Sequence, residues 1–138
     1  MNVLITLPSW LIKEISEYRK QYEIRTQIPL KYDPLHDRIF VVEKGTNKIR
    51  LSFRSPSFYG IENTSKVWRA FGDYLGISKE FYLKYTESRK KLFIWTINNL
   101  EVYDDGCLTT NEIGIRHNPQ SFCYFPRCKK ISKLFTKP

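Results

Sequence analysis

The chain has 138 residues, of which 41% are hydrophobic and 15% are aromatic, so it can bury the core of one globular domain. This composition excludes collagen-like, coiled-coil and wholly disordered chains. No apolar stretch approaches the roughly 20 residues that cross a bilayer, and the first ten residues lack the pattern of a signal peptide. We therefore expect a protein that is neither secreted nor associated with a membrane.

The chain is strongly basic, with 23 Lys and Arg residues, 14 Asp and Glu residues and a formal net charge of +9. The stretch from Arg116 to Pro138 contains six basic residues and no acidic residue, so it carries two-thirds of the net charge. Such a positive field favours polyanions, and nucleic acid is the first partner class to consider. A charged surface that only keeps the domain soluble is the alternative interpretation.

The first third of the sequence predicts a strand, a helix and a hairpin. Residues 3–6 are β-formers, and Ser9 is placed to cap the helix that follows. The spacing puts Leu11, Ile12, Ile15, Tyr18 and Tyr22 on the inner face of this helix and Lys20 on its solvent face. Residues 24–32 indicate a strand interrupted by Pro29. Residues 38–43 and 48–53 predict an antiparallel hairpin across a turn that contains Gly45.

The remaining sequence predicts a second helix and more strands. After a loop at residues 54–60, one of Asn63, Thr64 and Ser65 caps a helix that ends at Gly76 and buries Trp68 and Phe71. Residues 81–85 and 91–97 predict two paired strands, and residues 100–103 and 108–115 predict weaker ones. The expected fold class is mainly β (α+β), an open antiparallel β-barrel, or pseudobarrel, with two inserted helices.

Several short motifs lie in order between residues 49 and 97. They are the strand end Phe53-Arg54, a basic loop at 55–62, the helix motif Trp68-Arg69-Ala70-Phe71, the turn Leu75-Gly76-Ile77 and two aromatic strands. This order resembles the plant B-three (basic domain three) DNA-binding superfamily, in particular its reproductive-meristem branch. The Gly-Asp pair usual after the second helix of that family is replaced here by Ser78-Lys79.

The resemblance implies a B-three-like DNA-binding domain at residues 1–118 and a basic C-terminal tail at residues 119–138. It implies that this domain is the non-enzymatic part of a transcriptional regulator that binds double-stranded DNA. The location would be nuclear if the resemblance holds and cytoplasmic otherwise. The strand-to-helix loop at residues 54–66 and the basic tail would contact the DNA.

The residues themselves support the same contact surface, because guanidinium groups, ammonium groups and short hydroxyls suit phosphates and base edges. A surface loop with solvated arginines is the simpler interpretation of the same residues. The predicted DNA-binding residues are Arg50, Arg54, Ser55, Ser57, Tyr59, Asn63, Ser65, Lys66, Arg69, Arg127, Lys129 and Lys130.

The cysteines and histidines give a weak signal for zinc. Cys107, His117, Cys123 and Cys128 are suitable ligand types, but their spacing lacks the Cys-x2-Cys knuckle of a structural site. Three cysteines confined to the last third also argue against a disulfide framework. We therefore expect ordinary thiols, with no metal and no cofactor.

Two other functions remain open from the residues. The first is a small α+β inhibitor of viral or plasmid origin that docks its basic face on an acidic protein partner. The second is a small metal-dependent nuclease, for which Asp33, Asp37 and the pair Glu43-Lys44 are the nearest set of carboxylates and lysine. The nuclease alternative lacks the strand-borne acid-x-lysine pattern of such enzymes, so no catalytic residue is assigned.

Overall fold

The computed structural model describes residues 1–127 and residue 131. Those residues form two sheets, three α-helices and two short 3-10 helices. The elements in chain order are β1 (Asn2–Leu7), α1 (Ser9–Ser16), β2 (Tyr22–Arg25), β3 (Ile39–Glu43), β4 (Ile49–Arg54), β5 (Phe58–Glu62), α2 (Ser65–Phe71), η1 (Gly72–Tyr74), α3 (Lys79–Thr86), β6 (Lys91–Thr96), β7 (Asn98–Val102), η2 (Asn111–Ile113) and β8 (Phe122–Phe125).

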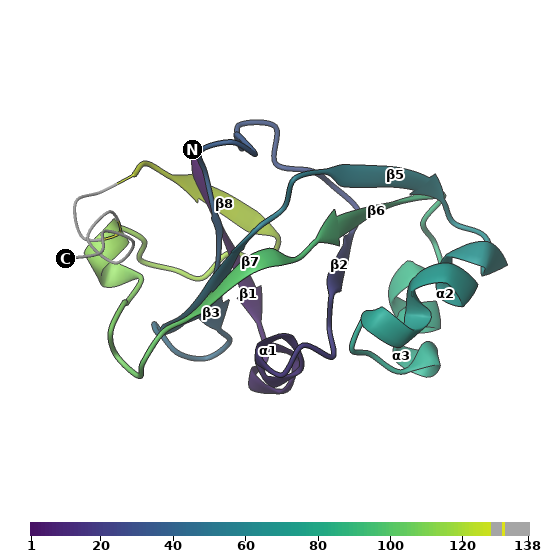
Figure 1. The fold of residues 1–138 in the computed structure, drawn as a ribbon, viewed down its shortest axis with the longest axis horizontal. Coiled ribbons are helices and arrows are strands. Elements are labelled where there is room, and N and C mark those ends of the chain that lie inside the picture. Colours follow the sequence, from purple (N-terminus) through teal and green to yellow (C-terminus); the bar gives the residue numbers. More distant parts are fainter. Residues whose placement is uncertain (128–130, 132–138) are drawn as a thin grey trace.

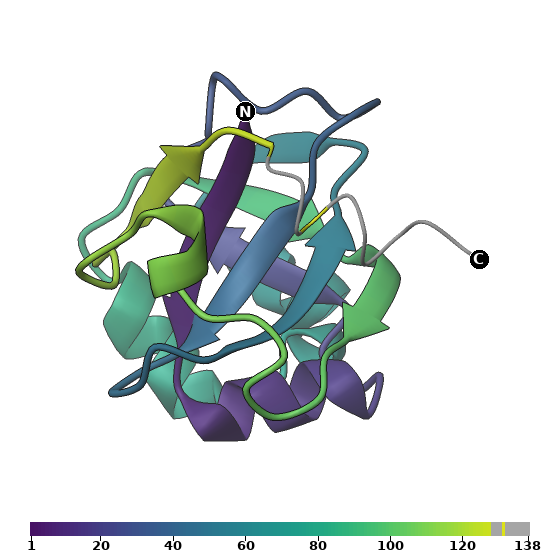
Figure 2. The same ribbon diagram turned by 90° about the vertical axis from the view of Figure 1, so that its left-hand side faces the viewer.

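The larger sheet has five strands in the order β7-β4-β3-β1-β8, which lie side by side in Figure 2. β1 runs parallel to β3, with Val3 opposite Ile39 and Leu7 opposite Glu43. The other strand pairs of the larger sheet are antiparallel. β1 is almost uniformly apolar and buried because both faces of the sheet are covered.

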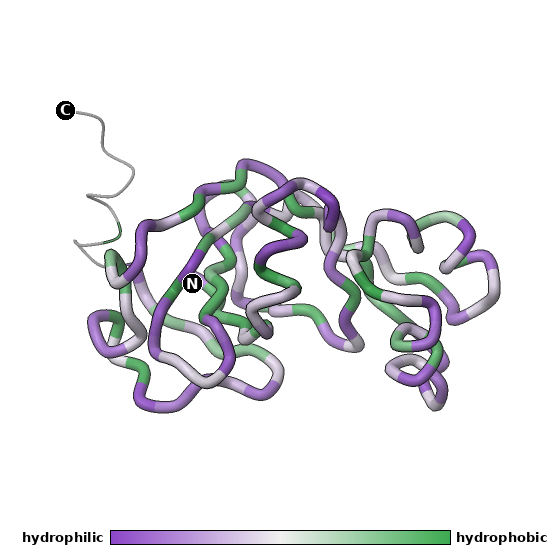
Figure 3. The backbone as a smooth tube through the Cα atoms, turned by 90° about the horizontal axis from the view of Figure 1, so that it is seen from below, coloured by the Kyte–Doolittle hydropathy of each residue, from purple (hydrophilic) through white to green (hydrophobic). Residues whose placement is uncertain are grey.

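The smaller sheet has three strands in the order β2-β6-β5, and α2 and α3 lie together beyond it (Figure 1). One core cluster lies between the two sheets and contains Phe53 and Trp95. Another joins the smaller sheet to the helices through Val67, Leu75 and Tyr82. Figure 3 shows the hydrophobic segments inside the molecule and the hydrophilic ones mainly in its connecting loops.

The expected fold class is confirmed, since the two sheets form an open, mostly antiparallel α+β pseudobarrel. The predicted β1, α1, β3–β4 hairpin, α2 and β6 are all present. Thr64 caps α2 by accepting a hydrogen bond from the Lys66 amide. Trp68 and Phe71 are only half-buried, however, and Val67 is the fully buried residue of that helix.

Residues 81–85 were predicted as a strand and form part of α3 instead. Ser78 caps this helix by accepting a hydrogen bond from the Phe81 amide at 3.1 Å. Its buried residues are Tyr82 and Thr86, four positions apart, which is the helical period. Phe81, Leu83 and Tyr85, whose alternation suggested a strand, are each more than one-third exposed on this helix.

Three further differences concern pairing. Residues 58–62, expected within a loop, form β5 and pair with β6. Residues 108–115 contribute one isolated bridge, Lys48 to Thr109, and η2 rather than a strand. Residues 122–125, within the stretch expected to be the basic tail, form β8 and pair with β1.

Among the described helices, none is long and apolar enough to cross a membrane.

Candidate ligand-binding cleft

A cleft of about 760 Å³ opens between the two sheets, at the end of the molecule where β1 leads into α1. Five segments meet there: the β1–α1 junction, residues 20–26 with β2, the β3–β4 turn, α3 with the residues before it, and the segment before β8. The lining residues are Thr6, Leu7, Pro8, Leu11, Lys20, Glu23, Ile24, Arg25, Thr26, Lys44, Gly45, Ile77, Phe81, Tyr85, Asn118, Pro119, Gln120 and Ser121.

The chain turns inward directly after α1, and this turn brings Lys20 into the cleft. Tyr18 adopts φ +61°, and the amides of Arg19 and Lys20 both donate to the Glu14 carbonyl at 2.9 Å. Gly76, at φ +70°, packs against the turn, and a Cβ there would lie 2.9 Å from the Lys20 Cβ. Lys20 was expected on the solvent face of a longer helix, but it is only 2% exposed.

Three charged side chains form a network at the base of the cleft. The Lys20 Nζ lies 3.3 Å from the Glu23 Oε1 and donates to the Leu75 carbonyl at 2.7 Å. The Arg25 Nη2 lies 3.3 Å from the Glu23 Oε2, and its Nη1 donates to the Ser121 carbonyl at 3.0 Å. Glu23 is therefore held between two cations that approach its two oxygens separately.

Burial controls the electrostatics of this network. Desolvation of the ammonium lowers the pKa of Lys20, and the neighbouring carboxylate of Glu23 opposes that shift. For Glu23, burial acts to raise the pKa, but the charges of Lys20 and Arg25 outweigh it and hold the pKa below its usual value. The result is a charged pair with little solvent and a lysine that gives up its proton more readily than an exposed one.

Aromatic and polar side chains surround the mouth of the cleft. Phe81 and Tyr85 of α3 are each more than one-third exposed, and the Phe81 ring meets Trp10 edge-on at 5.9 Å. Burial raises the pKa of the Tyr85 hydroxyl. Thr26 and Gln120 have side chains with no hydrogen-bond partner among the described residues. The mouth thus combines flat apolar rings with unused hydrogen-bonding groups.

The predicted DNA-binding residues do not gather on one surface. Arg50 is ion-paired with Glu43 at 3.3 Å and with Asp105 at 2.5 Å. Ser65, Lys66 and Arg69 are exposed on α2, whereas Arg50 lies on β4 in the larger sheet. These residues therefore lack a common binding face.

Several residues of the predicted reading loop have structural roles instead. Ser55 is buried, and its hydroxyl donates to the Ser57 carbonyl at 3.1 Å. Asn63 donates to the carbonyls of Thr86 and Arg89, both at 2.8 Å, and so ties the end of β5 to α3. Tyr59 is exposed on β5.

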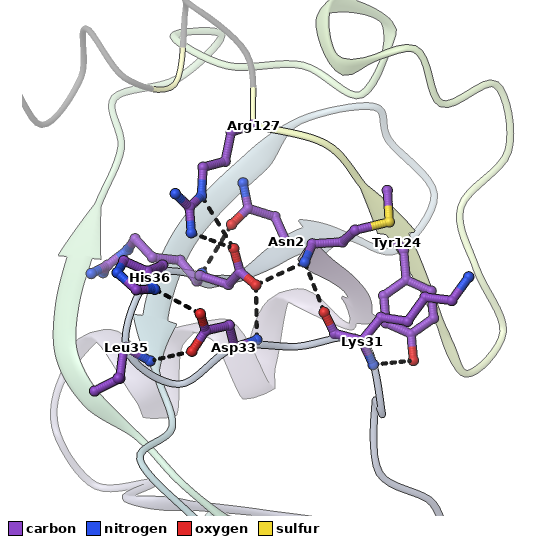
Figure 4. Close-up of polar contacts among 10 residues, drawn as sticks. Asn2, Lys31, Asp33, Leu35, His36, Tyr124 and Arg127 are labelled. Carbon is purple, nitrogen blue, oxygen red and sulfur yellow. Dashed lines mark hydrogen bonds and ion pairs between the residues drawn. The ribbon is translucent and has the colours of Figure 1, made fainter.

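Arg54 and Arg127 are brought together at a second, smaller pocket at the opposite end of the larger sheet. Figure 4 shows Arg127 beside the carboxylate of Asp37, with an Nη2–Oδ1 distance of 3.0 Å. Lys129 and Lys130, also predicted to bind DNA, lie outside the described residues.

Each of the candidate nuclease carboxylates contacts a basic side chain. Asp33 contacts His36 at 2.6 Å, Asp37 contacts Arg127, and Glu43 contacts Arg50. Within residues 1–127 and 131, no three His, Cys, Asp or Glu side chains are grouped as metal ligands would be. Cys128, one of the four zinc candidates, lies outside that part of the chain.

The fold is similar to crystal structures of ASCH proteins from the bacterium Zymomonas mobilis. Three of them, the protein titled ASCH and two single-substitution variants of ZmASCH, each give a TM-score of 0.78 at 20% sequence identity. The alignments cover 96% of this chain and 92% to 95% of theirs. This similarity establishes an ASCH-like fold. No family model and no curated protein matches the sequence.

The comparisons overturn the function expected from the sequence. The neighbours are bacterial ASCH structures rather than B-three domains, which contradicts a DNA-binding transcriptional regulator and its nuclear location. The physical reason is that residues 54–66 are not a free loop, because five of them form β5 and are hydrogen-bonded to β6. The B-three resemblance itself receives no support.

Sequence reasoning missed the cleft, although one signal for it was present. Lys20, Glu23 and Arg25 place three charges within six residues, shortly after the apolar face of α1 and on both sides of Ile24. In a strand, residues 23 and 25 point to the same side, opposite Ile24. Opposite charges on one face of a short strand next to a buried element would have indicated an internal ion pair.

Proposed function

We propose that the cleft binds single-stranded RNA and admits one unpaired nucleotide. The observation that carries this proposal is the buried network of Lys20, Glu23 and Arg25 at the base of the cleft. Buried charges are costly, and several of them in a cleft are typical of ligand recognition. Together they offer donors and acceptors that match the edge of a base.

The size and surroundings of the cleft also support a nucleotide. A volume of about 760 Å³ lies within the usual range for small-molecule sites. The exposed rings of Phe81 and Tyr85 provide surfaces on which a base can stack. The net charge of +9 attracts the phosphate backbone.

The concave shape favours an unpaired nucleotide over a duplex, because a nucleobase that is paired and stacked within a duplex cannot enter the cleft. Proteins that recognise RNA sequences usually bind bases splayed out of single strands and stack them on aromatic rings. The free side chains of Thr26 and Gln120 provide hydrogen-bond partners for a ribose 2′-hydroxyl. These features support RNA over DNA.

Exposed residues at the mouth allow a test that does not disturb the core. Phe81→Ala and Tyr85→Ala should each weaken binding of a fluorescent oligoribonucleotide by about tenfold, as expected for the loss of one stacked base. Leu83→Ala is the matched control, since Leu83 is exposed on the same helix but does not line the cleft. Fluorescence anisotropy gives the affinities.

The proposal is wrong if both aromatic variants bind the oligoribonucleotide as tightly as the parent does. It is also wrong if Leu83→Ala loses as much affinity as they do. An oligodeoxyribonucleotide of the same sequence tests the choice of RNA, because equal binding of the two strands would remove the proposed contact to the 2′-hydroxyl.

One observation favours a second function, acid–base catalysis on the bound nucleotide. The lowered pKa of Lys20 and its contact with Glu23 are properties of a proton-transfer pair. In that case the parent would convert a bound oligoribonucleotide into a new product. Glu23→Gln, at a temperature where it is folded, would bind the strand but form no product.

A further inference from the structure

A second pocket lies at the opposite end of the larger sheet from the cleft. It has a volume of about 200 Å³ and lies where β1 and β3 begin and β4 ends. The cleft lies where β1 and β3 end, so about five residues, or roughly 16 Å, separate the two along β1. Its lining residues are Asn2, His36, Arg38, Phe40, Arg54, Arg127 and Ile131.

Three of the lining side chains are arginines, and the sheet itself sets two of them together. Ile39 pairs with Phe53 across the antiparallel β3–β4 ladder, so Arg38 and Arg54 are the next residues opposite one another. Like charges directly opposite across a ladder destabilise a sheet. The charge of Arg54 acts to lower the pKa of Arg38, in addition to the burial of that guanidinium, which is the larger cause.

The third arginine comes from a distant segment. Arg127 follows β8, and its Nε and Nη2 both contact the Asp37 Oδ1, at 3.2 and 3.0 Å. Asp37 is shared with the Met1 ammonium, which lies 2.8 Å from its Oδ2. Figure 4 shows this arrangement, with the His36 ring turned to Asp33. One buried carboxylate therefore serves two cations.

Arg54 is the arginine of this pocket whose donors are available for a ligand. Arg38 donates to the Ser52 hydroxyl at 2.9 Å and to the carbonyls of Ser52 and Asn99, and these acceptors are uncharged. Glu101 is the carboxylate whose charge favours the ionised form of Arg38. The Arg54 side chain is half-buried and has no hydrogen bond or ion pair within the described part of the chain.

We infer that this pocket binds a phosphate group, held by the guanidinium groups of Arg38, Arg54 and Arg127. Arginine forks match phosphate oxygens geometrically, and the resulting charge-assisted hydrogen bonds are the strong ones. A bound dianion also removes the repulsion between the two arginines across the ladder. The group belongs either to a free phosphate or small phosphate ester, or to the end of a nucleic-acid strand.

Inorganic phosphate titrated into the parent protein at low ionic strength, followed by calorimetry, tests the pocket directly. We expect saturation at one phosphate per chain and a loss of about tenfold or more in affinity for Arg54→Gln. Arg54→Lys keeps the charge but loses the two-pronged guanidinium, so its phosphate affinity should lie between those of the parent and Arg54→Gln. Arg69→Gln is the matched control, because Arg69 is an exposed arginine on α2 outside the pocket.

The inference is overturned if the parent shows no saturable binding, or if Arg69→Gln weakens binding as much as Arg54→Gln does. Phe81→Ala, in the cleft, should leave phosphate binding unchanged, so failure here is distinguishable from failure of the RNA proposal. Oligoribonucleotides with a 5′-phosphate or a 5′-hydroxyl identify the source. A preference for the phosphorylated strand that disappears in Arg54→Gln assigns the pocket to strand ends, and equal binding assigns it to free phosphate or small esters.

Discussion

Glu23 and Asp37 are two buried carboxylates, one at the cleft and one beside the second pocket, and each is held by two cations. The cations of Glu23 have little exposure, with the Lys20 side chain buried at 1% and the Arg25 side chain partly buried at 13%. The cations of Asp37 are largely in solvent, with the Met1 ammonium at 42% and Arg127 at 52%. The same charge pattern is therefore dry at one end and wet at the other.

The difference separates two uses of an ion pair. In the dry network, removal of one charge leaves another with no solvent to compensate for it. In the wet network, water can replace the lost partner, so Asp37 mainly joins chain segments that are far apart in sequence. The dry network lies at the proposed RNA cleft, and the wet one lies beside the arginine pocket.

The largest expected effect is the loss of one partner from the dry network. Lys20→Met and Glu23→Gln should each lower the free energy of unfolding by about 3 to 5 kcal/mol, because each leaves a buried charge uncompensated. The double variant should lose clearly less than the sum of the two. Urea denaturation of all four proteins measures this coupling, and strict additivity would show that the two side chains do not interact.

The wet network should be more tolerant. Asp37→Asn should lower the free energy of unfolding by about 1 to 3 kcal/mol, the usual cost of breaking charged hydrogen bonds at a buried acceptor. Asp105→Asn is the control, since Asp105 also contacts two cations but is exposed, and we expect no measurable change there. A loss at Asp37 as large as that at Glu23 would contradict the distinction between the two networks.

Gly76 tests how tightly the turn holds Lys20. Gly76→Ala should cost about 1 to 2 kcal/mol for its left-handed backbone, and more because the new Cβ meets the Lys20 Cβ. Gly45→Ala has a similar φ of +82° and no atom within 4 Å of the new Cβ, so it carries the backbone cost alone. Thermal unfolding of both variants therefore isolates the contact, and equal losses would mean that Lys20 moves aside freely.

The smallest expected effect is a dependence on pH shared by both networks. The folded-state pKa values of Glu23 and Asp37 are both lowered, so both carboxylates stabilise the fold above about pH 4.5 and lose that contribution as the pH falls. The loss should be on the order of 1 kcal/mol over the first pH unit below that value. Urea denaturation between pH 6 and pH 3 measures it, and a flatter profile in Asp37→Asn assigns its share.

Local patterns in the sequence were sufficient for much of the fold. The β3–β4 hairpin follows from two apolar runs around Gly45, and α2 follows from a polar cap and a spaced apolar face. The partners of β6 were not predictable, because it joins β2 and β5, which are remote in sequence. Residues 81–85 alternate as a strand would, and only burial of Tyr82 and Thr86 reveals the helix.

The candidate site depended on tertiary structure in the same way. Lys20 continues the polar face of α1 in the sequence, and its burial follows from the end of that helix at Ser16 and the inward turn at Tyr18. Glu23 and Arg25 then face the cleft from β2. The predicted Arg54 and Arg127, 73 residues apart in the chain, line the same pocket because β8 returns alongside β1.

The position of β1 in the larger sheet, between β3 and the edge strand β8, bears on how the chain folds. β1 is paired on one side with β3, beginning with Val3 and Ile39, and on the other with β8, through Asn2 and Phe125. Contacts between such distant residues raise the contact order, and a high contact order slows folding because long loops must close first. During synthesis, the edge of β1 that pairs with β8 therefore remains unpaired until residue 125 has left the ribosome.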